Sequence, residues 1–205
     1  MSVKLKESSI GISGSLKITT IDALTGETIS VDSGKNLVLN SGLEDLCHLM
    51  AGDTTVPTDL IAGQTLNETV FALPHVPIYG QFGTSSIAPS SADSSNFDNG
   101  TLDINAASPT TASPIIKATA YYPLSTTTPP ISNSITVQFT LPPGEGNGPG
   151  GTDITYREAV LMCKIVDNPI QYSWFARRVF TDKIKNPTII MTAEWNFTFV
   201  PNLSN

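Results

Sequence analysis

The last third of the chain alternates between apolar and polar residues. In the segment TIIMTAEWNFTFV (residues 188–200), every second side chain is apolar from Ile189 to Phe199. From Met191 onward the residues that alternate with them are polar: Thr192, Glu194, Asn196 and Thr198. Successive side chains of a β-strand point to opposite faces, so this pattern predicts a strand with one buried face and one wet face. Further strands with β-type patterning are predicted in the same half of the chain at residues 114–124, 131–141, 153–166 and 172–180.

The N-terminal part predicts a β-hairpin followed by a helix. Residues 14–40 contain two β-type runs on either side of Gly26, which can adopt the positive φ of a tight turn. A helix is expected at about residues 42–51, with an apolar face formed by the side chains of Leu43, Leu46, Cys47 and Met50. The segment PIYGQFG (residues 77–83) reads as one further strand.

These elements predict one mainly β domain over residues 1–205. About eight strands, a single short helix and no alternation of strands with helices indicate an antiparallel β-sandwich, jelly-roll-like in type. The N-terminal hairpin and helix occupy residues 14–52, and the C-terminal β core occupies residues 115–200. Residues 53–77 and 84–114 are expected to be extended excursions, because they are rich in proline or in small polar residues.

The composition agrees with a β-rich protein and excludes two classes of partner. Only 14% of the 205 residues are charged, and the formal net charge is −7. An acidic chain lacks the cationic field that binds phosphates, so we expect no nucleic-acid partner. The sequence also shows neither a signal peptide nor an apolar run of membrane-spanning length. We therefore expect a product that is made in the cytoplasm, leaves it only by lysis and has no membrane partner.

No catalytic, cofactor or metal constellation is recognisable, so we expect a protein that is not an enzyme and binds no cofactor or metal. The two histidines, His48 and His75, lack metal-ligand spacing, and neighbouring side chains such as Cys47 and His48 diverge on a helix. Cys47 and Cys163 are expected to be buried free thiols. The glycine-rich segment 142–151 has no lysine and no phosphate-loop spacing, and it is expected to form a flexible tip.

Charged residues inside two of the predicted strands are expected to have a structural role. Glu158 lies in YREAVL, and Arg177 and Arg178 lie in WFARRVF. Charges between aromatic and aliphatic neighbours in a strand need partners, so Glu158 is predicted to pair with Arg177 or Arg178 across adjacent strands. The alternative is that the paired arginines recognise a carboxylate or phosphate of a ligand.

Five segments, taken in order, resemble a group of small tailed-bacteriophage virion proteins. They are KNLVLNSGLEDLCHLMAG, FGTSSIAPSSADSS, ITYREAVLM, WFARRVF and TIIMTAEWNFTF. They match a helix start of N-x-x-x-x-x-G-L type, a GTGTTAP-type loop, an EAGLF-type strand, a FARxxF strand and a terminal W-x-x-x-F strand. The likeness covers about residues 36–52 and 78–199. The loop here has Ser85-Ser86 in place of a second Gly-Thr, Val160 replaces a glycine, and the insertions at 53–77 and 96–114 are its own.

The resemblance implies a non-enzymatic virion protein that acts as a tail, collar or fibre-attachment component, with capsid decoration as the alternative. It also implies that the loop after residue 82 caps a strand, turns into a short helix and forms a rigid corner. The partners would be other virion proteins of the tail, neck or capsid, and further copies of the chain in a homo-oligomer. Tyr121, Tyr122 and Trp174 are candidate interface residues, unless they are core. A module that binds a carbohydrate or receptor, such as a host surface glycan, is the alternative from another class and would need exposed aromatic residues such as Tyr79.

Overall fold

The protein is a β-sandwich with one α-helix in the part of the chain that the structure describes. The computed structural model describes residues 9–50, 77–92, 116–117, 120–122, 134–167 and 170–202. In chain order the elements are β1 (Ser9–Asp22), β2 (Thr28–Lys35), β3 (Leu37–Val38), α1 (Asn40–Met50), β4 (Pro77–Gly83), β5 (Ile116–Lys117), β6 (Ala120–Tyr122), β7 (Ser134–Leu141), the 3-10 turn η2 (Pro149–Gly151), β8 (Ile154–Asp167), β9 (Ile170–Lys185) and β10 (Ile189–Asn202). The mainly β prediction and the short helix are confirmed.

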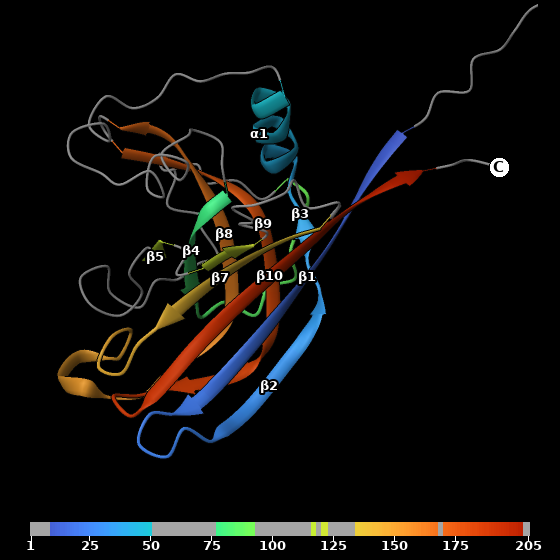
Figure 1. The fold of residues 1–205 in the computed structure, drawn as a ribbon. Coiled ribbons are helices and arrows are strands. Elements are labelled where there is room, and N and C mark those ends of the chain that lie inside the picture. Colours follow the sequence, from blue (N-terminus) through green and yellow to red (C-terminus); the bar gives the residue numbers. More distant parts are fainter. Residues whose placement is uncertain are drawn as a thin grey trace, which may run out of the picture.

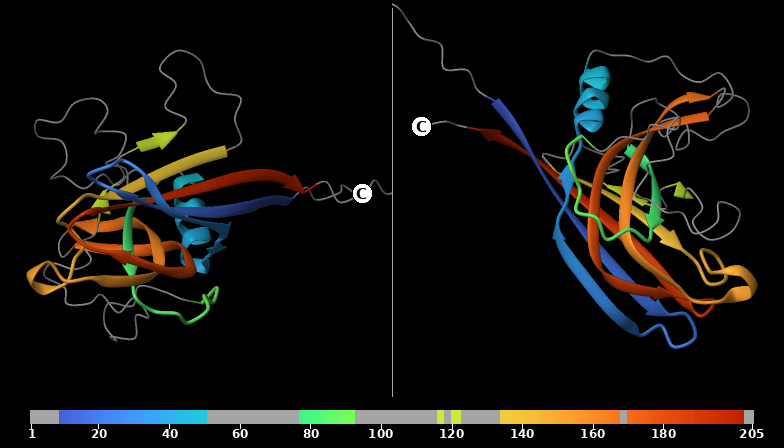
Figure 2. Two further views of the ribbon diagram at one scale, coloured as in Figure 1. Left: turned by 90° about the horizontal axis from the view of Figure 1, so that it is seen from below. Right: turned by 180° about the vertical axis from the view of Figure 1, so that it is seen from behind.

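The strands form two antiparallel sheets that pack face to face (Figures 1 and 2). Sheet A has the strand order β2-β1-β10-β7-β6, and sheet B has the order β3-β9-β8-β4-β5. The chain leaves sheet A at the end of β2 and enters sheet B at β3, with Asn36 between them. Because β2 and β3 are both edge strands, this corner joins the two sheets along one edge of the sandwich.

The core lies between the two sheets and is lined by alternate residues of each strand. Its fully buried members include Leu16, Ile18, Phe82, Val137, Leu161 and Trp195. Rings from opposite sheets meet there, since Phe175 of β9 and Phe197 of β10 form an edge-to-face pair with centroids 5.2 Å apart. Burial of these apolar side chains is the main stabilising term of such a fold.

Strand β10 shows the predicted alternation. Its side chains from Ile189 to Phe197 are buried at every second position, while those of Thr192, Glu194 and Asn196 are half-buried on the outer face. Phe199 departs from the expectation because it is only half-buried. It lies beyond Thr198, the last residue of β10 that pairs with β7, so strand β7 no longer flanks β10 at this position.

Strands β1 and β10 continue beyond the sandwich as a two-stranded ribbon. Residues 9–13 of β1 pair with residues 198–202 of β10. The neighbouring strands do not extend this far: β2 joins β1 only from Ser15 onward, and β7 joins β10 only up to Thr198. Figure 1 shows the ribbon projecting away from both sheets.

Around residues 158–163, sheet B is buried on both faces, unlike sheet A. On its outer face Leu39, Val160, Met162 and Trp174 form a second apolar cluster. Helix α1 packs on β9 beside this cluster, and the Ser41 hydroxyl donates a hydrogen bond of 2.5 Å to the Trp174 carbonyl. The clean alternation of β10 is therefore absent from β8, where residues 158–163 are all buried.

The face that α1 turns toward the sheet agrees with the predicted one at Leu46, which packs against the core, but differs from it at other positions. Leu43 is 46% exposed and Cys47 is exposed, whereas Gly42 and Asp45 are buried. A Cβ added to Gly42 would lie 2.3 Å from the Phe175 carbonyl oxygen, so the absent side chain lets the helix lie directly on the β9 backbone. The close approach of the two backbones therefore sets which side of α1 faces the sheet. The pattern of apolar residues in the sequence does not predict such an approach.

Two other segments differ from the sequence prediction. The segment 114–124 does not form one strand: β5 belongs to sheet B and β6 to sheet A. The glycine-rich segment predicted as a flexible tip packs on the sandwich, since Gly146, Asn147 and Gly148 are buried and the Tyr156 hydroxyl donates to the Gly146 carbonyl at 2.9 Å. Residues 53–76 and 93–114 lie outside the described residues.

Candidate functional site

A buried ion pair on the outer face of sheet B is the most concentrated polar feature that the structure describes. Arg177 donates to the Oε2 atom of Glu158 through Nε at 2.9 Å and through Nη2 at 2.7 Å. Both side chains are 0% exposed. An ion pair removed from water needs all of its remaining polar atoms satisfied, so its surroundings are informative.

The register of β8 and β9 explains which arginine pairs with Glu158. Arg177 lies opposite Val160, two residues from Glu158 and on the same face of the sheet. Arg178 lies opposite Ala159 and so is directed to the other face. Of the two arginines that the sequence offered as partners, the structure therefore selects Arg177.

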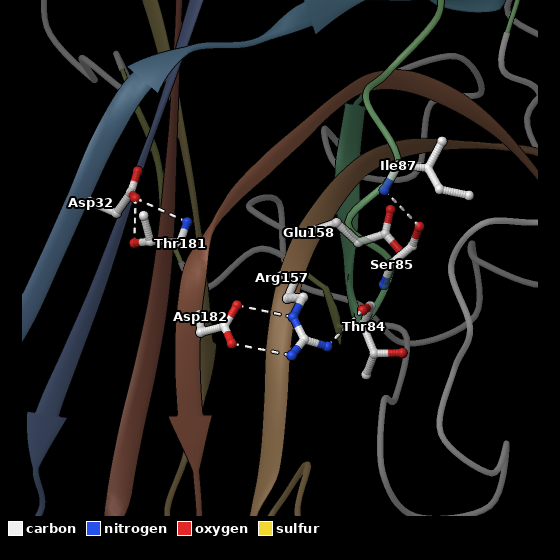
Figure 3. Close-up of polar contacts among 8 residues, drawn as sticks. All are labelled: Asp32, Thr84, Ser85, Ile87, Arg157, Glu158, Thr181 and Asp182. Atoms are coloured by element: carbon white, nitrogen blue, oxygen red, sulfur yellow. Dashed lines mark hydrogen bonds and ion pairs between the residues drawn. The ribbon is translucent and has the colours of Figure 1, made fainter.

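The ion pair fixes the loop that follows β4. The Ser85 backbone N–H donates to Glu158 Oε1 at 3.1 Å, and Arg177 Nη2 donates to the Ile87 carbonyl at 3.1 Å (Figure 3 shows the Glu158 side). Gly83 makes room for this contact, because an added Cβ would lie 2.4 Å from Glu158 Oε1. Further along, the Asn40 N–H donates to the Ser91 carbonyl at 2.9 Å, which ties the loop to the start of α1.

The loop is thus held on both sides, but its predicted conformation is partly wrong. Residues 84–92 contain no helix: they are irregular up to residue 90 and form a turn at 91–92. Hydrogen bonds from buried side chains to the backbone take the place of the intra-helical bonds that the resemblance implied.

Arg178 joins the two sheets along one edge of the sandwich. Its Nη1 donates to the Leu16 carbonyl at 2.7 Å, and its Nη2 donates to the carboxylate of Asp32 on β2. The backbone N–H and the hydroxyl of Thr181 also donate to Asp32, at 3.1 and 2.6 Å (Figure 3). Partial burial raises the pKa of Asp32, but the hydrogen bonds from Thr181 and Arg178 together outweigh it, so the pKa lies below its usual value.

The alternative in which these arginines recognise a ligand anion is wrong for the chain as it folds. Arg177 is 0% exposed, Arg178 is 11% exposed, and each binds a carboxylate from within the chain. Arg157 is the exposed arginine of the group, and it forms a two-bond pair with Asp182 at 2.9 and 3.1 Å (Figure 3). That pair lowers the pKa of Asp182, and its geometry matches the planar fork of a guanidinium to a carboxylate.

The aromatic residues predicted to contact a partner or a glycan lie in different environments. Trp174 is 3% exposed and belongs to the outer cluster of sheet B, so its interface role is wrong and the core alternative holds. Tyr121 and Tyr122 lie on β6, paired with Val137 and Thr136, but their side chains lie outside the described residues. Tyr79 is half-buried against the same outer cluster, so it offers no open platform.

A polar cluster beneath α1 was missed from the sequence. Asp45 is 3% exposed and accepts a hydrogen bond from the Ser173 hydroxyl. Burial, followed by the nearby Asp45 carboxylate, raises the pKa of the Cys163 thiol well above its usual value. A thiol held in its protonated form is a poor nucleophile. This cluster was not found from the sequence, because the helix face that was predicted to be buried does not include Asp45.

The remaining candidates for chemistry give no site. Cys47 and Cys163 are both free thiols, but only Cys163 is buried. The side chain of His48 and all of His75 lie outside the described residues. Among the residues that are described, no group of three or more His, Cys, Asp or Glu side chains is placed to hold a metal ion. Likewise, no helix in the described ranges has the length and apolarity to cross a membrane.

Searches for similar proteins gave no match. The chain matched no protein-family model, no curated protein and no solved structure.

Proposed function

We propose that the chain is a structural, non-enzymatic component of a tailed-bacteriophage particle, assembled at the tail, collar or fibre attachment. The observation that carries the proposal is the β1–β10 ribbon, which projects from the sandwich and in which residues 9–13 and 200–202 pair with no third strand among those that the structure describes. Such an element is suited to joining chains.

The ribbon has a physical need for a neighbour. An isolated pair of strands is marginally stable in water, because it buries little apolar surface and leaves one row of backbone groups on each strand without a ladder. Residues 9–13 and 200–202 have no strand other than each other to pair with among the described strands. Adding a strand from a neighbouring subunit would supply the missing main-chain hydrogen bonds.

Three of the five segments that carry the family resemblance also meet in one place. Glu158 of ITYREAVLM and Arg177 of WFARRVF form the buried pair, and that pair holds Ser85 and Ile87 of FGTSSIAPSSADSS. Segments that are far apart in the sequence are thereby joined by specific contacts. This supports the resemblance, because a shared set of motifs is expected to preserve a shared structural corner.

A change at the ribbon edge tests the assembly role. We expect the wild-type chain to self-associate or to join particles, and we expect Ser13→Lys to weaken that association at least tenfold, because a lysine on an edge strand discourages further pairing. Ser33→Lys is the matched control, since Ser33 is also exposed but lies on β2 opposite Lys17, outside the ribbon. Sedimentation velocity over a range of protein concentrations measures the association.

Particle association is measured separately. Phage particles from the source of this gene are purified on a density gradient and labelled with an antibody to the chain for electron microscopy. Label at the tail, collar or fibre base supports the proposal, and label spread over the head moves the protein to capsid decoration. Absence of the chain from intact particles would refute a virion role.

A further inference from the structure

The end of β9 holds a lysine that is removed from water. Lys185 is 0% exposed, and its Nζ atom donates to Asn147 Oδ1 at 3.1 Å and to the Asn186 carbonyl at 3.0 Å. Both acceptors are neutral, so the ammonium form of the side chain loses its hydration and gains no counter-charge from them. The side chain of Asn147 is therefore in direct contact with an amine that burial destabilises in its charged form.

The surroundings of Lys185 favour the neutral amine. Burial lowers the pKa of Lys185 to about 8, although the negative charge of Glu145 opposes this change. At pH 7 about one molecule in ten then carries a neutral amine at this position, against fewer than about one in a thousand for a lysine with the ordinary pKa. A neutral amine has a free electron pair, so Lys185 is able to act as a nucleophile.

Asn147 presents an electrophilic carbon to that amine. It is 5% exposed, and its Oδ1 atom, which accepts the hydrogen bond from Lys185, is bonded directly to the carboxamide carbon Cγ. The preceding residue, Gly146, lies against Leu141 and Tyr156, which are 0% and 1% exposed. The amine and the carboxamide are thus held together in a site with little access to water, which favours a reaction between them.

The reaction that is common for an asparagine before a glycine is hindered here. In a flexible chain the backbone nitrogen of the glycine attacks the asparagine carboxamide, and ammonia is lost. In this fold the Gly148 N–H donates to the Thr152 carbonyl at 2.8 Å. A Cβ added to Gly148 would lie 2.2 Å from Thr152 Oγ1, so the backbone is closely packed at this point. The backbone nitrogen is therefore engaged elsewhere, and the Lys185 amine is the nucleophile that lies beside Asn147.

We propose that Lys185 and Asn147 form an intramolecular isopeptide bond. The bond from Nζ to Cγ forms, the bond from Cγ to Nδ2 breaks, and Nδ2 leaves as ammonia. From the ammonium form of Lys185 the products are a neutral amide and one ammonium ion, so atoms and charge balance without an oxidant or a co-reactant. Glu145, two residues before Asn147, is a carboxylate whose charge acts on Lys185, and it carries the proton from Nζ to the departing nitrogen.

The bond closes residues 147–185 into a covalent ring. It fastens the glycine-rich segment before β8 to the end of β9, at the place where that segment already packs on the sandwich. A covalent link across such a span restricts the unfolded chain and so stabilises the fold. This inference goes beyond the proposed function and does not depend on it.

The intact mass of the chain under denaturing conditions tests the bond. The wild-type chain, expressed alone and purified, should be lighter than its sequence mass by one ammonia, about 17 Da. Lys185→Arg keeps the charge but removes the nucleophile, and Asn147→Leu removes the carboxamide, so both should have the full sequence mass. Lys17→Arg, at an exposed lysine on β1, is the matched control and should lose ammonia as the wild type does.

Peptide mapping separates the bond from a cyclic imide at Asn147, which loses the same mass. Tandem mass spectrometry should find one peptide in which Lys185 and Asn147 are joined, and trypsin should not cleave after Lys185. An imide formed with Gly148 would persist in Lys185→Arg and would be cleaved by hydroxylamine, and that result without a linked peptide would overturn the proposal. A wild-type chain that keeps its full mass for several days at pH 9, where Lys185 is mostly neutral, would also overturn it.

Glu145→Gln tests the transfer of the proton. The charge of Glu145 raises the pKa of Lys185, so its removal alone would increase the neutral amine and speed the reaction. We expect instead that the bond forms at least about tenfold more slowly than in the wild type, as followed by mass after cell-free synthesis. Glu27→Gln, at an exposed position after β1, is the control. Equal or faster formation in Glu145→Gln would exclude Glu145 as the proton carrier.

Discussion

The outer faces of the two sheets satisfy their polar side chains in different ways. On sheet A the outer face carries a ladder of hydroxyl and amide side chains, in which Thr136 donates to Asn196 at 2.5 Å and Ser134 shares a bond of 3.0 Å with Thr198. On sheet B the outer face is covered by α1 and the 84–91 loop, and it holds a fully buried ion pair. Water can hydrate the polar side chains on the outer face of sheet A, whereas other groups of the protein hydrogen-bond to those on the outer face of sheet B.

This difference between the two faces indicates where the loss of a single side chain should reduce stability most. A polar ladder in contact with water loses little when one member is removed, because water replaces the lost hydrogen bond. A buried ion pair has no such replacement, so the loss of one partner leaves the other charged and unsolvated. Substitutions on sheet B should therefore be several times more costly than those on sheet A.

The largest effect is expected for Glu158→Gln. The substitution keeps the shape of the side chain but leaves the guanidinium of Arg177 buried without its counter-charge, which should lower the free energy of unfolding by about 3–5 kcal/mol. Urea denaturation followed by circular dichroism measures this change. The loop bonded through Ser85 and Ile87 should also become more accessible to proteolysis.

Asp182→Asn is the matched control, since it removes the carboxylate of the exposed pair with Arg157. The two side chains are 63% and 38% exposed, and water solvates both charges, so the expected loss is much smaller than that for Glu158→Gln. Equal losses for the two substitutions would show that the Glu158–Arg177 pair is not protected from water as the structure has it.

Gly42→Ala tests the cover of sheet B and should have the second-largest effect. An alanine normally stabilises a helix by about 1 kcal/mol relative to glycine, but here its Cβ would lie 2.3 Å from the Phe175 carbonyl oxygen. The helix would have to move, so we expect a net loss of about 1–3 kcal/mol in urea denaturation. Cys47→Ala, on the exposed side of α1, should change stability by less than about 0.5 kcal/mol, and a gain in stability for Gly42→Ala would contradict the docking of the helix.

Asp32→Asn tests the junction between the two sheets and should have an intermediate effect with a distinct dependence on pH. The folded pKa of Asp32 lies below the ordinary value of 3.8, so its contribution is fully present above about pH 4 and is lost as the pH falls through the folded pKa. We expect a loss of about 1–2 kcal/mol at pH 6.

The loss should shrink as the pH falls below 3.8 and the wild-type carboxyl also becomes protonated. Unfolding free energies of both proteins measured from pH 6 to pH 2 give the comparison, with Asp153→Asn, at an exposed loop position, as the control. A difference between wild type and Asp32→Asn that stays constant over this range would exclude a role for the charge of Asp32.

Thr136→Val on sheet A should have the smallest effect. It removes the hydroxyl that donates to Asn196, while Asn196 keeps its 3.2 Å bond to Glu194. We expect a loss of about 0.2–1 kcal/mol by urea denaturation. A loss comparable with that of Glu158→Gln would remove the proposed contrast between the two faces.

The same contrast accounts for which parts of the fold could be predicted. The alternation of β7 and β10 was read correctly because one face of sheet A is wet, so polarity along the chain reports directly on burial. In sheet B that signal is lost, and the apolar and charged residues 158–163 are buried together. Glu158 and its arginine were still found, because charges inside an apolar strand require a partner wherever the strand lies.

The sequence by itself determined the β class, the strands of the C-terminal half, the position of the short helix and the pairing of Glu158 with an arginine. Each depends on local periodicity or on the need to satisfy a charge. Only the tertiary structure decided that α1 docks through Gly42 and Asp45, and that the 114–124 segment is divided between two sheets. These features arise from contacts between segments distant in sequence, where backbone approach and shared desolvation, rather than the polarity of neighbouring residues, set the free energy.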